Sequence, residues 1–366
     1  MTMTNRERLL AVYANEMPDR IPIGIYSRYH RVGATERVAR NCGLGIIDCL
    51  PPVSLLAPPW HVHPGYISEV RNAEFRIGHR WVDGRIVQRR SYETPVGSVE
   101  AHVVMDPATG TEWTARHYIE TADDYRVVQY LAEHTVFRSQ GAMVRQRLAD
   151  LGGDGILFGR LDRTPYQKLL VELAHPEKLI MDLHENPGPV EELMQVLGAR
   201  MDEQCEAVME SDVRIVWQPD NITADLTPPA FFKKYCLPFY KKHGDRCRAA
   251  GKIYAVHVDG RTKGIRHLIA EAPIDVIESF SLLEMSGDMS VPDARATWPG
   301  KVICPNFPAN MCSNSREEIA AYLRRVAADF GRHTPFAIQI SEDIPPETYP
   351  YVLPLLSESA CEMRTS

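Results

Sequence analysis

Residues 253–278 read IYAVHVDGRTKGIRHLIAEAPIDVIE, and this stretch decides the fold. Its two ends are short apolar runs that predict strands, and the segment 261–272 between them predicts a helix. Strands that alternate with helices form parallel βαβ units. An ionisable residue ends each of the two strands, His257 in the first and Glu278 in the second. The stretch therefore predicts a parallel sheet with polar groups at the carboxyl ends of its strands.

The same alternation continues from about residue 120 toward the C-terminal end. The helices that it predicts lie near 122–134, 140–151, 165–175, 188–210, 228–250, 261–272 and 315–331. The strands that it predicts are 155–158, 214–217, 253–257, 274–277, 301–304 and 336–340. Such a series forms either an open doubly wound sheet or a closed (β/α)8 barrel.

Polar residues at the ends of many strands favour the barrel. They are Asp220, Asp259, Glu278, Asn306 and Glu342. In a barrel the catalytic groups come from the carboxyl ends of several strands, whereas an open sheet gathers them at one switch point beside a glycine-rich turn. The chain has no G-x-G-x-x-G or P-loop sequence after any predicted strand. We therefore predict an α/β fold of the (β/α)8 TIM-barrel type.

The first third of the chain differs in composition and residue pattern from the rest. Residues 21–66 are rich in proline and aromatic residues, and strand-like alternation follows over about 67–105. Within that alternation, Asp83-Gly84 is a strong hairpin signal and the segment 94–97 gives a second turn. We predict an N-terminal extension with a small antiparallel β-insertion, inside a single domain that spans residues 1–366.

Composition narrows the class of protein. The 366 residues are 44% hydrophobic and 24% charged, which is typical of a globular protein. The 41 Lys and Arg against 48 Asp and Glu give a net charge of −7, which disfavours binding to nucleic acid. No apolar run approaches the roughly 20 residues of a membrane span, and the N-terminus lacks the apolar core of a signal peptide. Eight cysteines without a Cys-x-x-Cys pair indicate a reducing compartment, so we predict a cytoplasmic protein.

A metal site is the simplest interpretation of the strand ends. His257 and Asp259 stand at i and i+2, so their side chains share one face of the strand, and imidazole with carboxylate suits Zn²⁺. Glu278 and Glu342 end apolar strands, where an unpaired carboxylate would be costly to bury. We predict that these four residues bind a divalent cation, with Cys304 as a further soft ligand. The alternatives are a His–Asp pair that acts as a general base, and carboxylates that pair with arginine or lysine or face solvent.

Other side chains are candidates to handle substrate. Asp220 and Asn306 follow predicted strands and would orient the substrate as catalytic groups. The predicted substrate-binding residues are Tyr26, Arg28, His61, Tyr166 and Trp217. For the aromatic members, a place in the core is the alternative.

Nine short segments have a characteristic order and spacing. They are RERLL (6–10), PDRIP (18–22), ETPVG (93–97), TADDY (121–125), HVDG (257–260), IDVIE (274–278), GD (287–288), NFP (306–308) and SEDIP (341–345). Together they resemble the uroporphyrinogen decarboxylase superfamily nearly end to end, and most resemble its methyltransferase-like branch. This resemblance implies a (β/α)8 barrel that is often homodimeric.

One branch of that superfamily comprises the decarboxylases themselves. Their N-terminal Arg-Gln-Ala-Gly-Arg-Tyr stretch grips the carboxylates of a tetrapyrrole, and the matching segment here reads YSRYHR (26–31). Arg28 and Arg31 remain, although the motif does not. A decarboxylase that acts on a tetrapyrrole or a smaller acid, with these arginines as clamps, is therefore the alternative function.

The other branch contains corrinoid-dependent methyltransferases and O-demethylases. Its coenzyme M methyltransferases bind zinc through His-x-Cys and a later Cys. His257 matches that pattern, whereas Asp259 and Glu342 stand in the two cysteine positions. An oxygen-rich site suits polarisation of an ether, hydroxyl or carboxylate oxygen.

The resemblance thus implies a metal-dependent methyltransferase, with zinc as the expected metal. It would transfer a methyl group between a small methylated substrate, such as a methoxy compound, and a separate corrinoid protein. The chain has no Asp-x-His-x-x-Gly motif to bind a corrinoid of its own, because Asp182-Leu183-His184 continues to Pro187 and lies inside a helical pattern. A non-catalytic barrel that binds a corrinoid or a metal is a further alternative.

Overall fold

The computed structural model describes residues 3–54, 70–107 and 112–363. The chain divides into two compact units. The barrel unit comprises Met1–Leu50, Gly141–Arg160 and Ser211–Ser366, and the insert unit comprises Pro51–Gln140 and Leu161–Glu210. In the described part of the chain, no helix has the length and apolar character needed to cross a membrane.

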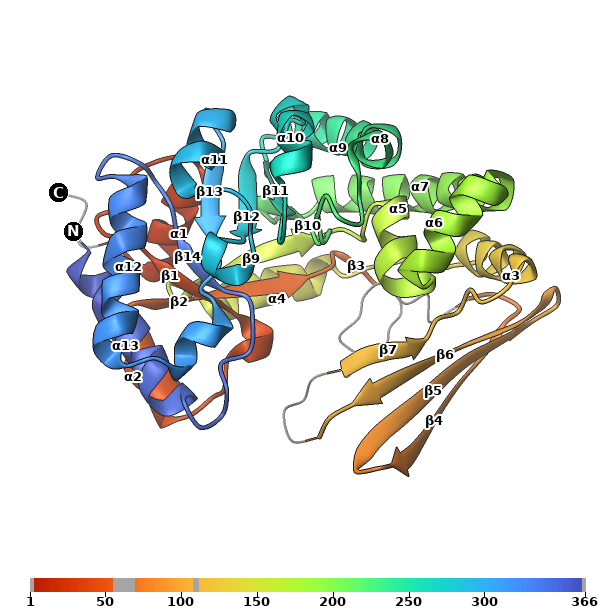
Figure 1. Ribbon diagram of the computed structural model, residues 1–366, viewed down its shortest axis with the longest axis horizontal. Coiled ribbons are helices and arrows are strands. Elements are labelled where there is room, and N and C mark those ends of the chain that lie inside the picture. Colours follow the sequence, from red (N-terminus) through yellow and green to blue (C-terminus); the bar gives the residue numbers. More distant parts are fainter. Residues whose placement is uncertain (1–2, 55–69, 108–111, 364–366) are drawn as a thin grey trace. The chain divides into compact units, whose positions relative to one another are not determined.

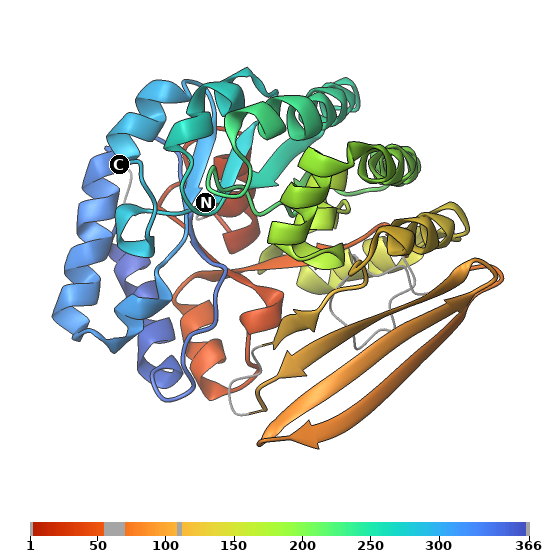
Figure 2. The same cartoon turned by 45° about the vertical axis from the view of Figure 1, so that its right-hand side comes forward.

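Eight parallel strands form the barrel unit (Figures 1 and 2). They are β1 (Ile23–Tyr26), β2 (Leu44–Leu50), β9 (Gly155–Arg160), β10 (Ile215–Gln218), β11 (Ile253–His257), β12 (Val276–Phe280), β13 (Val302–Pro305) and β14 (Ile338–Ile340). The strand order is β13-β12-β11-β10-β9-β2-β1-β14, and a bridge between Asn306 and Gln339 brings its two ends together. The sheet is therefore nearly closed, and the predicted (β/α)8 barrel is confirmed.

Helices separate most of these strands along the chain. They are α1 (Asn5–Tyr13), α2 (Ala34–Asn41), α4 (Gly141–Leu151), α8 (Pro229–Phe231), α9 (Leu237–Ala249), α10 (Arg266–Glu271), α11 (Val291–Thr297), α12 (Arg316–Phe330) and α13 (Tyr349–Glu362). A π-helical turn at Phe232–Cys236 joins α8 to α9, so the helix predicted near 228–250 is continuous. Local sequence starts α12, because Ser315 and Glu318 form a capping box that satisfies backbone N–H groups.

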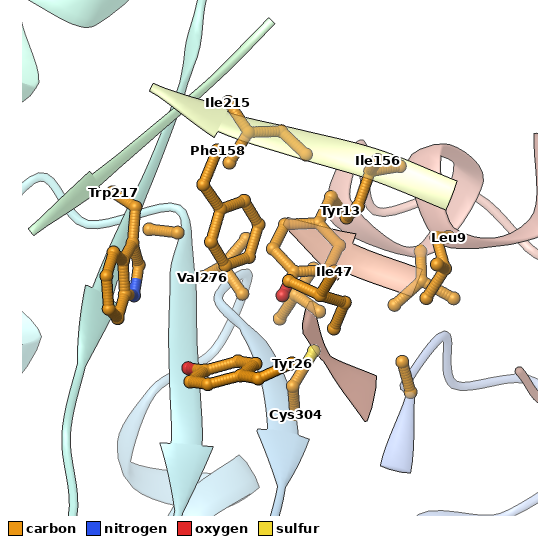
Figure 3. Close-up of a cluster of buried hydrophobic side chains, with 14 residues drawn as sticks. Leu9, Tyr13, Tyr26, Ile47, Ile156, Phe158, Ile215, Trp217, Val276 and Cys304 are labelled. Atoms are coloured by element: carbon orange, nitrogen blue, oxygen red, sulfur yellow. The ribbon is translucent and has the colours of Figure 1, made fainter. Parts of the chain in front are cut away.

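Helix α1 contributes to the core of the barrel unit. Its Leu9 and Tyr13 pack among strand residues such as Phe158 (Figure 3). Close approach of the helix depends on Gly45, since a Cβ there would lie 2.6 Å from Leu9 Cδ1. The hydroxyl of Tyr13 accepts a hydrogen bond of 2.7 Å from the Gln339 side chain of β14. Apolar packing and this buried hydrogen bond together hold α1 against the strands.

The insert unit contains the predicted antiparallel sheet. Its strands are β4 (Glu74–Val82), β5 (Arg85–Thr94), β6 (Gly97–Met105) and β7 (Glu112–Arg116), in that spatial order. Asp83 and Gly84 form the first turn with φ values of 50° and 76°, as the hairpin signal predicts. Thr94 pairs with Gly97 across the second turn. The β-insertion is therefore confirmed.

Helices and a second, smaller sheet complete the insert unit. The helices are α3 (Ala122–Glu133), α5 (Pro165–Lys168), α6 (Pro176–Glu185) and α7 (Pro187–Met209), and the two-stranded sheet pairs β3 (Val53–Ser54) with β8 (Arg138–Ser139). Helix α3 packs on β5 and β6, where Tyr92, Val99 and Val127 are buried. One face of the four-stranded sheet thus belongs to the core of this unit.

Candidate active site

Glu278 is the centre of a hydrogen-bonded group inside the barrel. Its carboxylate is fully buried on β12, and its Oε1 accepts a hydrogen bond from the hydroxyl of Tyr26 on β1. Its Oε2 accepts a bond of 3.0 Å from Trp217 Nε1 on β10 and lies 2.7 Å from His257 Nδ1 on β11. Four strands thus each contribute one polar side chain to this group. We call Tyr26, Trp217, His257 and Glu278 the Glu278 cluster.

Sheet register explains the central contact of the cluster. His257 is the direct partner of Glu278 in the parallel β11–β12 pair. Paired residues of neighbouring parallel strands project to the same side of the sheet, which here is the barrel interior. Trp217 pairs with Ala255 on the other side of β11, so its indole also projects inward. The cluster therefore follows from the strand alignment.

The imidazole of His257 contacts carboxylates through both ring nitrogens. Its Nε2 lies 3.6 Å from Asp259 Oδ2, while Nδ1 contacts Glu278. Burial opposes the charged form of the ring, but the two carboxylates outweigh it and raise the pKa of His257 to about 10. The ring is therefore an imidazolium at neutral pH in the metal-free protein. Burial and the charge of Glu278 also raise the pKa of Tyr26 well above its ordinary value, so the phenol remains a hydrogen-bond donor.

A third carboxylate lies close enough to interact electrostatically with this histidine. Burial raises the pKa of Glu342, which follows β14, and a hydrogen bond from the backbone N–H of Ala309 opposes that rise. The negative charge of Asp259 raises the same pKa further, and the positive charge of His257 lowers it. The structure therefore brings Glu342 into the neighbourhood of His257 and Asp259.

The side chains around His257 can be compared with the ligands that a divalent cation prefers. No three His, Cys, Asp or Glu side chains within residues 3–54, 70–107 and 112–363 already stand together as a metal-binding cluster. Even so, the Asp259 carboxylate lies 3.6 Å from His257 Nε2, and the pKa of Glu342 responds to the charges of both residues. One nitrogen with carboxylate oxygens suits a borderline cation such as Zn²⁺. Glu278 contacts the opposite ring nitrogen, as a carboxylate that orients a ligand histidine does. In donor chemistry the residues therefore fit such a cation.

Three other predicted site residues have structural partners. Cys304 is fully buried in the apolar core cluster of the barrel, and burial raises the pKa of its thiol (Figure 3). Asn306 accepts a bond of 3.1 Å from the Ser341 backbone N–H beside the seam between β13 and β14. Asp220 is fully buried and accepts a bond of 2.6 Å from the Tyr240 hydroxyl of α9.

The remaining predicted substrate-binding residues are dispersed. Tyr166 is buried in the insert unit, and His61 lies outside the described residues. Arg28 is exposed, with its guanidinium 4.8 Å from the centre of the Tyr29 ring. Of the predicted substrate-binding residues, the structure joins Tyr26 and Trp217 to the Glu278 cluster.

Arg160 lies at this site, and from the sequence it was only one of the basic residues that could pair with the strand-end carboxylates. It ends β9, is partly buried, and its guanidinium lies 5.4 Å from the centre of the Trp217 ring. Its positive charge also opposes the rise that burial causes in the pKa of Cys49 on the neighbouring strand. The sequence signal that identifies Arg160 is the same one that identifies the other candidates, namely an ionisable residue at the end of an apolar strand.

The fold and the polar groups at its strand ends define the class of (β/α)8-barrel enzymes. Residues 168–363, more than half of the chain, match the family model for uroporphyrinogen decarboxylase (URO-D), and the chain therefore belongs to the URO-D family.

A structural comparison gives a fold of the same kind. A methyltransferase from Methanosarcina mazei is similar over 98% of this chain and 98% of its own, with a TM-score of 0.57. The sequence identity of 12% means that this similarity shows the shared fold alone. A comparison with curated proteins finds no match.

Proposed function

We propose that this protein is a metal-dependent methyltransferase that moves a methyl group between a small methylated substrate, such as a methoxy compound, and a separate corrinoid protein. Membership of the URO-D family and a fold shared along nearly the whole chain with a methyltransferase support this proposal. The observation that carries it is His257, whose Nδ1 contacts a buried carboxylate while its Nε2 faces Asp259. A histidine oriented in this way is arranged as a metal ligand.

The metal ligands in this proposal are His257, through Nε2, together with Asp259 and Glu342. When bound, the cation would polarise the heteroatom that gives up the methyl group. Glu278 is also a ligand in the prediction from the sequence, but both of its oxygens already accept hydrogen bonds or contact His257. We therefore assign Glu278 the task of orienting the His257 ring.

Tyr26 and Trp217 support that orientation. Each donates a hydrogen bond to a different oxygen of Glu278, so the carboxylate is fixed and its charge is stabilised. The fixed carboxylate in turn holds the imidazole with Nε2 directed away from it. Rotation of the histidine would break a buried charge-assisted contact, which makes the arrangement rigid before substrate binds.

Elemental analysis of protein purified without added metal tests the ligand assignment. We expect stoichiometric metal in the wild type, and strong loss of metal in His257→Ala and Glu342→Gln because each removes a donor. The matched control is His267→Ala, which changes an exposed histidine on α10 and should retain metal. Loss of metal in none of the variants, with a lowered melting temperature in Glu342→Gln, would contradict the assignment.

The alternative function is a decarboxylase, which the family match favours. In that case Arg28 and Arg31 would grip carboxylates, but both are exposed and lie 4.8 Å and 5.0 Å from the ring centres of Tyr29 and Tyr349. Changing both arginines to Ala should therefore leave turnover of a neutral methyl donor within about tenfold, or about 1.4 kcal/mol. Loss of several orders of magnitude in steady-state kinetics, with the fold intact, would favour the decarboxylase.

A further inference from the structure

Strand β12 is irregular immediately after Glu278. Between Ile277 and Phe280, β12 advances three residues while its partner β13 advances two. Two residues of one strand opposite one residue of its neighbour form a β-bulge. Ser279 lies in this bulge, is almost fully buried and has a φ of 58°. A serine in the left-handed region is uncommon, and residues in such conformations cluster at functional sites.

The bulge changes the side of the sheet that the following residue faces. In a regular strand, the residues at i and i+2 project to the same side. Glu278 projects into the barrel, where it contacts His257. Phe280 instead packs against Trp298 at the end of α11, with 5.7 Å between the ring centres, and the helices of a (β/α)8 barrel form its outer layer. The bulge therefore lets β12 direct Glu278 inward and bury Phe280 against the helices.

The side chain of Gln339 on β14 supports the bulge. Its Oε1 accepts a hydrogen bond of 2.6 Å from the backbone N–H of Ser279, and its Nε2 donates one of 2.7 Å to the Tyr13 hydroxyl. Both ends of the amide are therefore in use, which fixes its orientation. Gln339 is fully buried, and a buried N–H that loses its acceptor is costly. The amide thus holds the bulge in one conformation.

A second contact connects the bulge to the end of β14. The hydroxyl oxygens of Ser279 and Ser341 lie 2.5 Å apart, and the Ser341 backbone N–H donates a bond of 3.1 Å to Asn306. Ser341 immediately precedes Glu342, which is a metal ligand in the proposed function. The bulge is therefore connected along the chain to Glu278 and, through Ser341, to Glu342.

We infer that Gln339 is a positioning residue of the site. By holding the Ser279 bulge, it fixes the direction in which the Glu278 carboxylate projects. Through that carboxylate it also sets the orientation of the His257 ring. Bulges beside active sites re-aim side chains in this way. The orientation of Glu278 is a property of the metal-free protein, whereas the consequence for metal binding rests on the proposed function.

The indole N–H of Trp217 reports the position of Glu278, because it donates a hydrogen bond of 3.0 Å to that carboxylate. Nitrogen–proton correlation spectra of tryptophan-labelled protein give one indole signal for each of the five tryptophans, and Trp217→Phe identifies its signal. Gln339→Leu removes the acceptor of the bulge N–H, so the Trp217 signal should shift by more than its linewidth. The signal of Trp298, which donates to a backbone carbonyl of α10, should stay in place.

Two substitutions of Ser279 test the bulge itself. Ser279→Gly keeps the backbone N–H and accepts a positive φ without strain, so the Trp217 signal should stay near its wild-type position. Valine rarely adopts a positive φ, so Ser279→Val should shift the signal as Gln339→Leu does. The matched control is Asp275→Ala, which removes a side-chain acceptor 2.8 Å from the Tyr254 backbone N–H near the start of β11. It should lower the melting temperature and leave the Trp217 signal unchanged.

Metal affinity, measured by competition with a chelator, extends the test to the His257 ring. Gln339→Leu should weaken binding about 10- to 100-fold, the usual effect of changing a group that supports a ligand histidine. Ser279→Gly and Asp275→Ala should bind metal as the wild type does. Unchanged affinity in Gln339→Leu, in a protein whose wild type binds metal, would overturn the link from Gln339 to His257.

The Trp217 signal decides the inference independently of metal. An unmoved signal in Gln339→Leu, or an equal shift in Asp275→Ala, would overturn it. If Gln339→Leu does not fold, the Ser279 variants decide, and equal signals in Ser279→Gly and Ser279→Val would overturn it. A wild type that binds no metal would contradict the proposed function, while the Trp217 signals would still decide whether Gln339 positions Glu278.

Discussion

The His257 side chain lies between two carboxylates, and its charge should therefore appear in the pH dependence of stability. Its pKa is raised from 6.5 to about 10 in the folded, metal-free protein, because Asp259 and Glu278 overcome the effect of burial. A group with a raised pKa stabilises the fold fully below its unfolded value, and that contribution disappears as the pH rises through the folded value. The window for His257 is therefore pH 6.5 to about 10.

Asp259→Asn removes one of the two charges that raise this pKa. We expect the variant to show a smaller loss of stability than the wild type as the pH increases across that window. Urea denaturation with a chelator present, at several pH values between 6 and 11, measures the difference. Equal pH dependence in the two proteins would show that Asp259 does not stabilise the imidazolium.

The Glu278 cluster shows what sequence can predict about single residues. His257 and Glu278 were predicted as neighbours because strand ends meet at one rim of a barrel, and their register partnership confirms this. The bonds from Tyr26 and Trp217 to Glu278 were not predicted. These hydrogen bonds depend on which inward-facing residues lie at the same height in strands that are far apart in the sequence. Local sequence patterns do not contain that alignment.

At the scale of elements, α1 is tied to the chain that enters β1. Arg8 is almost fully buried, and its Nε and second guanidinium nitrogen donate bonds of 2.6 Å and 3.0 Å to the two oxygens of Asp19. The hydrogen bond from Arg8 lowers the pKa of Asp19. A lowered pKa contributes stability above the unfolded value of 3.8, and this stability is lost as the pH falls through the folded value.

Asp19→Asn should accordingly destabilise the protein by about 1 kcal/mol at pH 7, because Asp19 is exposed and solvent screens its ion pair with the buried Arg8. The difference from the wild type should begin to shrink near pH 3.8, where Asp19 of the unfolded chain is protonated, and should disappear as the pH falls through the lower folded pKa. Chemical denaturation at pH 7 and pH 3 measures both values, with Asp329→Asn, at an exposed position of α12, as the control. An equal cost at the two pH values would contradict the role of the ion pair.

Elements with strong local signals were predicted well, and the first two barrel strands were not. The turn at Asp83-Gly84 and the helices near 122–134 and 315–331 agree with the structure because turn chemistry and 3.6-residue periodicity are local. Strands β1 and β2 read IGIY and LGIIDCL, which are short, mostly buried and free of alternation. Fully buried strands of this kind are not distinguished by periodicity.

The molecule consists of two compact units, but neither unit is one continuous segment of the chain. The chain passes between the barrel unit and the insert unit four times, after Leu50, Gln140, Arg160 and Glu210. Each unit is therefore assembled from separate segments of the chain. The single domain stays a prediction.

One cooperative unfolding transition would agree with that prediction. Far-UV circular dichroism reports helices in both units, and tryptophan fluorescence reports Trp217 and Trp298 in the barrel unit and Trp81 and Trp113 in the insert unit. We expect the two signals to coincide through a thermal or urea transition. Two separated transitions would show that the units unfold independently.

Methyl transfer can be measured as the absorption change when reduced cobalamin becomes methylated. Purified protein should be incubated with chemically reduced free cobalamin and a panel of methoxyarenes, before and after removal of metal by a chelator. We expect methylcobalamin to form with at least one donor and only when the metal is present, to be lost in His257→Ala, and to be retained in His267→Ala. Absence of methyl transfer together with release of CO₂ from a carboxylic acid substrate would contradict it.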